Sequence, residues 1–128
     1  MTMRSRMIDS LACAVALAMA AWWGFHATAS AAEGAVTIKL FQYQPGTLTV
    51  RAGTRVVWIN GDEIQHTVTA GTPEQRGGRF AAKLDGKGAS TSVTFDEAGV
   101  YPYFCERHQH MRGEIRVNLR STQRGDEP

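Results

Sequence analysis

Three side chains that bind soft or borderline metal ions lie close together near the end of the sequence. Cys105, His108 and Met111 are separated by two residues each, so a thiolate, an imidazole and a thioether can meet on one short turn. A second imidazole is available from His66, at the start of a β-like segment further upstream. Two His and one Cys in a trigonal arrangement, with a weak axial Met, form the type 1 copper site. The residue types therefore predict one copper ion that alternates between Cu(I) and Cu(II).

His110 is the alternative imidazole in this segment. It is adjacent to Met111 in the sequence, and neighbouring side chains of an extended chain point in opposite directions. We therefore expect His108 to bind the metal, and His110 to be a surface residue or a docking contact. Zinc is the less suitable ion, because its protein sites are tetrahedral and use Cys and His rather than a thioether.

The N-terminus has the pattern of an export signal. Arg4 and Arg6 precede an apolar run from Leu11 to Phe25, and small residues follow over 27–32. A basic start, a short apolar middle and a small-residue cleavage site are typical of a secretory signal, whereas a membrane-spanning helix needs roughly 20 apolar residues. We therefore predict a signal peptide over residues 1–32 and a periplasmic mature protein without a membrane span. An uncleaved N-terminal anchor is the alternative.

Cleavage would leave one domain over residues 33–128, in which Cys105 is the only cysteine. An exported protein enters an oxidising compartment, where a thiol without a disulfide partner is a liability. Metal binding would remove that liability. The formal net charge of the whole chain is only +2, which does not favour a nucleic-acid partner, since nucleic-acid-binding proteins usually carry a strongly basic face.

Alternating apolar and polar residues predict a β-rich mature domain. Short strands are expected over residues 36–40, 47–50, 54–59, 66–70, 92–95, 100–104 and 114–119. Turn signals such as Gln44-Pro45-Gly46 separate them, and the pattern favours an all-β sandwich or barrel. Residues 71–91 are predicted to be a long connection with at most one strand or helical turn. The tail from about residue 121 is polar and predicted to be frayed.

Two segments of the sequence resemble the cupredoxins. YPYFCERHQHMRGEIRV (101–117), with WINGDEIQHTV (58–68) upstream, is most similar to the amicyanin branch, which is marked by a short Cys-x-x-His-x-x-Met loop followed by Arg-Gly. FQYQPGTLTVRAGTRVVWIN (41–60) resembles the opening strands of plastocyanin-like domains. The resemblance implies a Greek-key β-sandwich of the cupredoxin type and a type 1 copper ion bound by His66, Cys105, His108 and Met111.

One position departs from the family pattern. Thr67 follows the first ligand, where many family members have an Asn that ties the two ligand loops together and tunes the thiolate. Threonine can form a hydrogen bond there, but its side chain is shorter. The reduction potential is therefore the property that this departure puts in doubt.

The resulting functional hypothesis is a periplasmic electron shuttle rather than an enzyme. The resemblance implies redox proteins as partners, with a periplasmic amine dehydrogenase and a c-type cytochrome as the amicyanin-like pair. A copper-binding chaperone or store is the alternative, although a Met- or His-rich tract is missing from residues 33–128. A multicopper enzyme would need more His residues than the three in that range.

Other conspicuous residues have mainly structural interpretations. Trp58 and Phe104 are expected in the core, and Tyr101 or Tyr103 could form the corner hydrogen bond of β-sandwiches. Three arginines flank the metal-binding segment, either as ordinary solvated charges or as a basic rim that steers an acidic partner: Arg107, Arg112 and Arg116.

Overall fold

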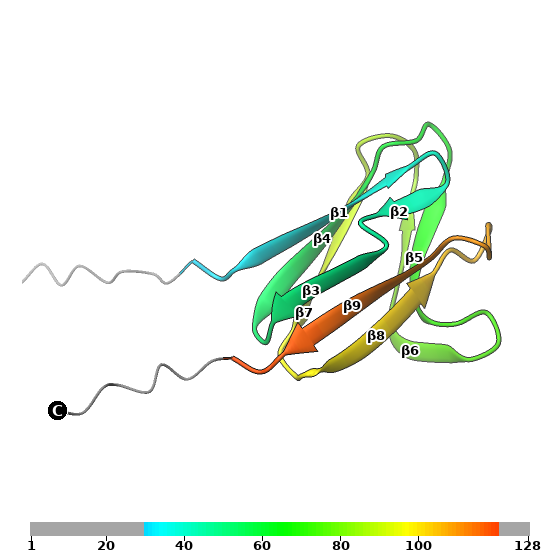
Figure 1. Ribbon diagram of the computed structural model, residues 1–128. Coiled ribbons are helices and arrows are strands. Elements are labelled where there is room, and N and C mark those ends of the chain that lie inside the picture. Colours follow the sequence, from blue (N-terminus) through cyan, green and yellow to red (C-terminus); the bar gives the residue numbers. More distant parts are fainter. Residues whose placement is uncertain (1–29, 121–128) are drawn as a thin grey trace, which may run out of the picture.

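The computed structural model describes residues 30–120, which form two β-sheets packed face to face (Figure 1). The tail from residue 121 lies outside the described residues, as does nearly all of the predicted signal peptide over 1–32. Both therefore stay predictions. Between residues 30 and 120 the structure contains no helix that is long and apolar enough to cross a membrane.

Nine strands make up the two sheets within the described range. In chain order they are β1 (Glu33–Lys39), β2 (Gln42–Gln44), β3 (Thr47–Arg51), β4 (Thr54–Asn60), β5 (His66–Gly71), β6 (Arg76–Leu84), β7 (Ser90–Phe95), β8 (Gly99–Phe104) and β9 (Arg112–Asn118). One sheet has the order β2-β1-β4-β7 and the other β3-β9-β8-β5-β6. The chain crosses between the sheets after β2, β3, β4, β6 and β7. This arrangement confirms the predicted all-β sandwich.

The strands form where the sequence alternates between apolar and polar residues. On β1, Val36 and Ile38 are fully buried while the residues beside them face solvent. The same alternation on β4 buries Trp58, whose ring packs edge-on against Tyr103 at a centroid distance of 5.4 Å. Phe104 is also buried. The core assignment of both Trp58 and Phe104 is thus confirmed.

The segment over 71–91 is more regular than predicted. It contains the nine-residue strand β6, which pairs antiparallel with β5, and the start of β7 at Ser90. Only Leu84 of β6 is fully buried, because this strand lies at the edge of its sheet. Backbone pairing rather than side-chain burial holds it, so the sequence shows little alternation there. The short strand β2 was likewise not predicted, since its last residue begins the Gln44-Pro45-Gly46 turn.

Two neighbouring tyrosines of β8 have different roles. The Tyr101 hydroxyl donates a hydrogen bond of 2.7 Å to the carbonyl oxygen of Glu97, which confirms the predicted corner interaction for this residue. The Tyr103 hydroxyl is buried and has no hydrogen-bond partner among residues 30–120. Its ring lies directly over Gly113, where a β-carbon would collide with it. Glycine in the Arg-Gly pair after the metal-binding segment is therefore required by the Tyr103 ring.

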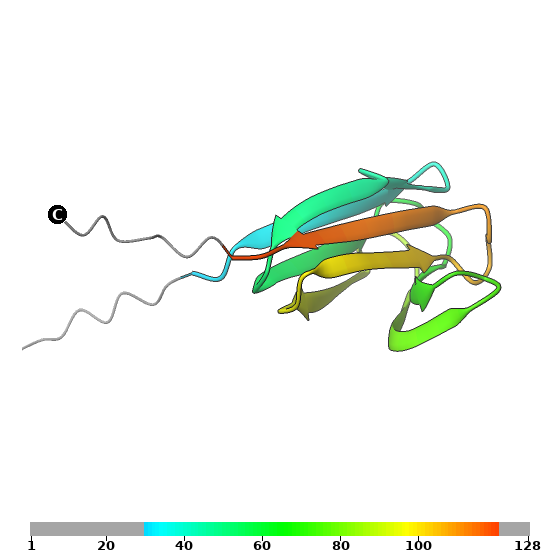
Figure 2. The ribbon, with the colours of Figure 1, turned by 60° about the horizontal axis from the view of Figure 1, so that its bottom comes forward.

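The connections that carry the predicted ligands gather at one end of the sandwich. The β1–β2 turn, the β4–β5 connection and the β8–β9 loop lie there, opposite the start of β1 and the end of β9 (Figures 1 and 2). β5 begins and β8 finishes at this end. These two strands are direct neighbours but pair at only two register positions.

Candidate metal centre

Three of the four predicted ligands meet at this end of the molecule. Cys105 Sγ lies 3.9 Å from His66 Nδ1 and 3.7 Å from His108 Nδ1, and the three donor atoms all lie within 4.8 Å of one another. His66 is the first residue of β5, Cys105 directly follows β8, and His108 lies in the β8–β9 loop. Residues far apart in the sequence meet here because β5 and β8 are adjacent strands.

The separation of these donor atoms suits a single metal ion. With a metal–sulfur bond of ~2.3 Å and a metal–nitrogen bond of ~2.0 Å, two ligands 120° apart would lie about 3.7 Å from each other. The sulfur–nitrogen distances at Cys105 are close to this value. A thiolate with two imidazoles in a trigonal arrangement is a copper donor set. The residues present therefore fit copper by both spacing and chemistry.

The β8–β9 loop is closed by its own backbone. Cys105 N donates a hydrogen bond of 3.1 Å to the carbonyl oxygen of Met111, and Met111 N donates one of 2.8 Å to that of His108. These bonds hold the three residues on one compact turn, as their spacing predicted. Met111 is 2% exposed and belongs to the same buried cluster as Cys105. His110, by contrast, is exposed, and its donor atoms are not part of the three-residue group.

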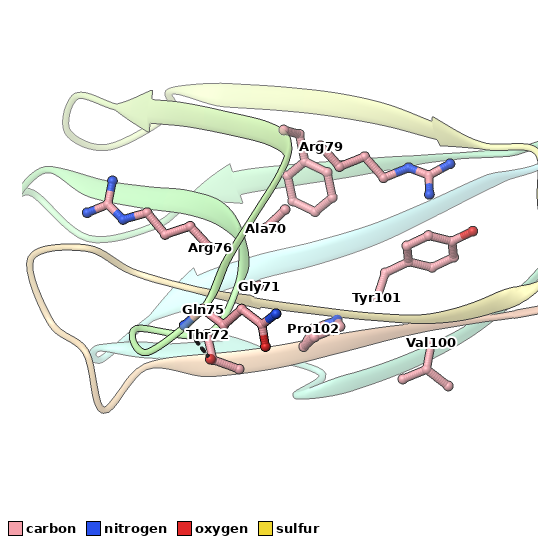
Figure 3. Close-up of a pocket in the computed structure, with 11 residues that line it drawn as sticks. Ala70, Gly71, Thr72, Gln75, Arg76, Arg79, Val100, Tyr101 and Pro102 are labelled. Atoms are coloured by element: carbon pink, nitrogen blue, oxygen red, sulfur yellow. Dashed lines mark hydrogen bonds between the residues drawn. The ribbon is translucent and has the colours of Figure 1, made fainter.

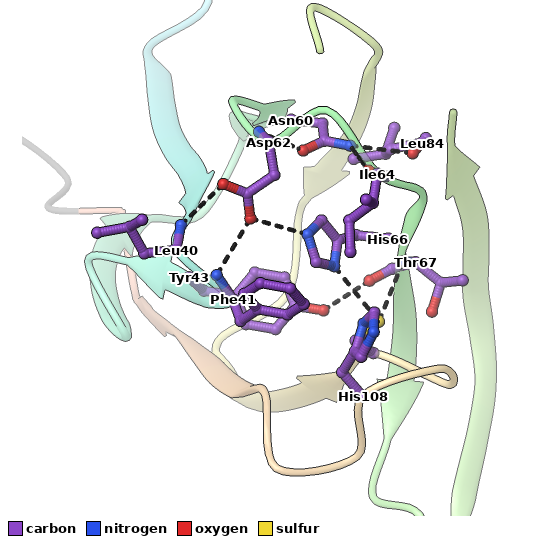
Figure 4. A network of polar contacts seen from close by, with 11 residues as sticks. Leu40, Phe41, Tyr43, Asn60, Asp62, Ile64, His66, Thr67, Leu84 and His108 are labelled. Atoms are coloured by element: carbon purple, nitrogen blue, oxygen red, sulfur yellow. Dashed lines mark hydrogen bonds and ion pairs between the residues drawn. The ribbon is translucent and has the colours of Figure 1, made fainter. Parts of the chain in front are cut away.

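A carboxylate that the sequence did not reveal orients the buried imidazole. His66 Nε2 lies 2.9 Å from Asp62 Oδ2 (Figure 4), while the other ring nitrogen, Nδ1, faces Cys105 Sγ. The carboxylate accepts the Nε2 proton, so that the lone pair of Nδ1 points towards the thiol. Metal-binding histidines are commonly held in this way, which fixes the ring and makes it a stronger ligand. The only clue in the sequence is a carboxylate four residues before His66.

Asp62 also holds the turn that covers the site. It accepts backbone hydrogen bonds from Leu40 N at 2.8 Å and Phe41 N at 3.1 Å. Both residues have positive φ, 52° and 58°, a conformation that costs a non-glycine residue free energy. Burial alone would raise the pKa of the Asp62 carboxyl, but these two amides and His66 outweigh it and lower the pKa. Asp62 is therefore ionised in the folded protein at neutral pH.

Phe41 forms the outer cover of the two imidazoles. Its ring packs edge-on against His66 at a centroid distance of 5.5 Å and against His108 at 5.0 Å. The side chain is 42% exposed, so one part of the ring faces solvent while another touches both ligand rings. Sequence reasoning missed this residue, because a single aromatic side chain in a turn carries no spacing signal.

Comparison with known proteins agrees with this geometry. The family model described as copper binding proteins, plastocyanin/azurin family, matches residues 30–118. The chain belongs to the cupredoxins. It is similar to an amicyanin of Paracoccus versutus, with 34% identity over 64% of this chain and 62% of that protein. A plastocyanin of Scenedesmus fuscus is 35% identical over 64% of this chain and 98% of the plastocyanin.

The fold of a solved cupredoxin is also similar. A purple cupredoxin from Nitrosopumilus maritimus superposes with a TM-score of 0.62 and 25% identity, over 66% of this chain and 99% of that protein. The predicted resemblance to amicyanins and plastocyanins is thus confirmed, and copper is the cofactor of this cupredoxin.

Thr67 ties the two ligand segments of this cupredoxin together. Its backbone N–H points at Cys105 Sγ, 3.4 Å away, and its Oγ1 accepts a hydrogen bond of 2.8 Å from Glu106 N. On the other side, the Tyr43 hydroxyl donates to the Thr67 carbonyl oxygen at 2.6 Å. Burial, and then the nearby Cys105 thiolate, raise the pKa of Tyr43, which keeps this hydroxyl a donor. Threonine therefore reaches the second ligand loop in spite of its shorter side chain.

The charges around His108 favour its neutral form. Burial lowers the pKa of His108, and the electrostatic influence of His66, Arg107 and His110 lowers it further. A neutral imidazole retains the lone pair that a metal needs.

The three flanking arginines all have polar partners: Arg107 bonds to Gln65, Arg112 pairs with Glu74, and Arg116 pairs with Glu114. Two of the three charges are thus balanced locally, which favours ordinary solvated charges over a basic rim.

The ligand cluster is separate from the hollow between β6 and β8. That hollow, of about 440 Å³, is lined by residues such as Ala70, Phe80 and Pro102 and by none of the four predicted ligands (Figure 3). At its edge the Arg79 guanidinium lies 4.7 Å from the centre of the Tyr101 ring. The metal centre is therefore buried among loops and does not open into this hollow.

Proposed function

We propose that this cupredoxin is an exported, periplasmic carrier of single electrons, with its copper ion held by His66, Cys105, His108 and Met111. The observation that carries the proposal is the close approach of three donor atoms, within 4.8 Å of one another, in a fold that belongs to a copper-binding family. Copper, when bound, supplies the one-electron redox couple. The chain itself supplies the ligands, their fixed geometry and the exclusion of water.

Each ligand has a distinct role in this proposal. Cys105 is the thiolate ligand, and the Thr67 N–H directed at its sulfur stabilises the negative charge. His66 is the rigid ligand, since it is completely buried and Asp62 holds its Nε2. His108 is the ligand nearest to solvent and the point of electron entry and exit. Met111 is the weak axial ligand, and its burial keeps the sulfur away from water.

Exposed apolar side chains lie beside the proposed electron port. Leu40, Phe41 and Ile64 are 72%, 42% and 41% exposed; Phe41 and Ile64 lie next to the imidazoles, while Leu40 lies in the same turn as Phe41 and points outward (Figure 4). A small apolar contact of this kind suits a redox partner that must dock briefly and leave quickly. The relationship to amicyanins suggests a periplasmic dehydrogenase as the donor and a c-type cytochrome as the acceptor. A carrier of this kind transforms no substrate and is not an enzyme.

The test is the spectrum of the copper-loaded protein. Oxidised protein should show an intense visible band from the Cys105 thiolate to Cu(II), which reduction removes. Cys105→Ser and His108→Ala should lose the normal band, and the matched variant His110→Ala should keep it. A Cys105→Ser protein that kept the band would contradict the ligand assignment.

Kinetics then separate a carrier from a chaperone or store. Stopped-flow mixing of the reduced copper protein with an oxidised c-type cytochrome should give electron transfer within milliseconds to seconds, with copper retained. Slow electron transfer, together with transfer of copper to a partner protein or chelator of similar affinity, would favour the store.

A further inference from the structure

The side of the Cys105 segment that faces away from the ligand cluster carries a chain of polar side chains. Thr67 and Thr69 lie two residues apart on β5, so their side chains point to the same face of the sheet. Each is only 4% exposed. Their Oγ1 atoms are 3.3 Å apart, and Thr69 Oγ1 lies 3.3 Å from Glu106 Oε1. We call Thr67, Thr69 and Glu106 the hydroxyl chain.

The hydrogen bonds of the hydroxyl chain can have only one order of donor and acceptor. An ionised carboxylate can only accept, so the Thr69 hydroxyl donates to Glu106. A hydroxyl has one proton, and Thr69 Oγ1 must therefore accept from the Thr67 hydroxyl. Thr67 Oγ1 in turn accepts the backbone N–H of Glu106 at 2.8 Å. The chain thus begins at the amide of Glu106 and finishes at the carboxylate of the same residue.

This closed arrangement strengthens the contact next to the metal ligand. Hydrogen bonds in series polarise one another, most of all where water is excluded and one end is charged. The negative charge of Glu106 therefore makes Thr67 Oγ1 a better acceptor for the amide that follows Cys105. The Arg76 guanidinium, 3.0 Å from Glu106 Oε1, holds the carboxylate from the solvent side. Backbone pairing of Thr69 with both β6 and β8 fixes the middle of the chain.

The hydroxyl chain connects the residues that directly follow two of the proposed ligands. Thr67 directly follows His66, and Glu106 directly follows Cys105. The Thr67 N–H also points at Cys105 Sγ. We propose that Glu106 is a positioning residue, which acts through Thr69 and Thr67 to fix the Cys105 sulfur relative to His66. This inference rests on the proposed copper site, and it assigns the tuning of the thiolate to a carboxylate that does not touch it.

The decisive variant is Thr69→Val, which removes the middle hydroxyl but keeps the shape of the side chain and the Glu106–Arg76 ion pair. Hydrogen exchange of the Glu106 amide, measured by NMR in the metal-free protein, should become about ten-fold faster. In the copper-loaded protein the thiolate-to-copper band and the reduction potential should both shift. Thr69→Ser should restore all three properties, because it restores the hydroxyl.

Two further variants distinguish the chain from a simple surface ion pair. Arg76→Gln removes the exposed ion pair, which contributes little, and should leave the Glu106 amide and the band close to wild type. Glu106→Gln keeps an acceptor without its charge and should give an amide exchange rate between those of wild type and Thr69→Val. Unchanged amide exchange and an unchanged band in Thr69→Val would overturn the inference.

The failure of this inference can be distinguished from a failure of the proposed function. If even the wild-type protein showed no thiolate band with copper, the copper site would be wrong, while the amide measurement would still test the hydroxyl chain. If Thr69→Val did not fold, Glu106→Gln and Thr69→Ser would supply the comparison, and equal amide exchange in Glu106→Gln and wild type would contradict the role of the charge.

Discussion

The replacement Asp62→Ala tests how the carboxylate supports the buried ligand. It would leave His66 Nε2 without a partner at a site where the ring is completely buried, and it would remove the acceptor for two backbone amides in the strained 40–41 turn. A buried donor left unpaired costs about 1–3 kcal/mol. Solvent can replace the acceptor of the more exposed amides at lower cost, so we expect a total loss of about 3 kcal/mol in the free energy of unfolding of the metal-free protein.

Urea denaturation followed by tryptophan fluorescence measures this loss directly. Trp58 is the only tryptophan in residues 33–128 and is fully buried, so its emission should report global unfolding. Asp62→Asn keeps one acceptor oxygen and should lose about 1 kcal/mol. Asp96→Ala, which removes an exposed aspartate near the opposite end of the sandwich, is the matched control and should stay close to wild type. Copper affinity of Asp62→Ala should fall by roughly 10–100-fold.

The pH dependence of the same measurement has a definite sign. The pKa of Asp62 is lower in the folded state than the ordinary value of about 3.9. Its contribution to stability is therefore complete above about pH 5 and is lost as the pH falls through the folded-state pKa. The stability difference between wild type and Asp62→Ala should shrink accordingly in acid. If Asp62→Ala unfolded at the wild-type urea concentration and bound copper as tightly, the carboxylate would not be holding His66.

Three further predictions concern the tyrosines and their neighbours. Gly113→Ala should lose about 2 kcal/mol of stability in urea, because its β-carbon would collide with the Tyr103 ring, whereas Gly46→Ala, which has space, should lose less. Tyr101→Phe should lose about 1 kcal/mol with the Glu97 hydrogen bond, and an unchanged midpoint would contradict a structural role for this corner. Burial raises the pKa of Tyr103 to about 12, above the unfolded value of about 10, so Tyr103 alone should contribute up to about 1.4 kcal/mol per pH unit to the fall in wild-type stability between pH 10 and 12. Tyr103→Phe should show a shallower fall, and equal slopes would exclude this tyrosine as the cause.

The sequence was most informative where residue type and spacing carry the chemistry. Cys105, His108 and Met111 are separated by distances that a short turn can close, and the backbone bonds of the loop close it. His66 could be proposed as their partner because few other imidazoles remain after the predicted signal segment. The sandwich followed from the alternation in β1, β4 and β7, where one face of each strand enters the core.

The parts that the sequence did not predict depend on tertiary contacts. Asp62 lies beside His66 only because the chain turns back between β4 and β5, and the Phe41 ring covers the imidazoles only because Asp62 holds its amide. Thr67 has a shorter side chain than the Asn of many family members, yet it bonds to the backbone of Glu106, whose approach no local pattern encodes. The prediction around β6 went no further than a long connection with at most one strand or helical turn, since backbone pairing holds an edge strand that buries little apolar surface.

The short pairing between β5 and β8 has a consequence for how the protein opens. Only two register positions pair these strands, and beyond them the contacts of Thr67 with Cys105 and Glu106 join the two segments. A copper ion bound by both His66 and Cys105 would add a cross-link at this end of the sheet. Copper binding should therefore add most to local rigidity there. Release of the ion would then require transient separation of β5 and β8 rather than unfolding of the whole sandwich. The rate of this local separation would set how fast copper dissociates.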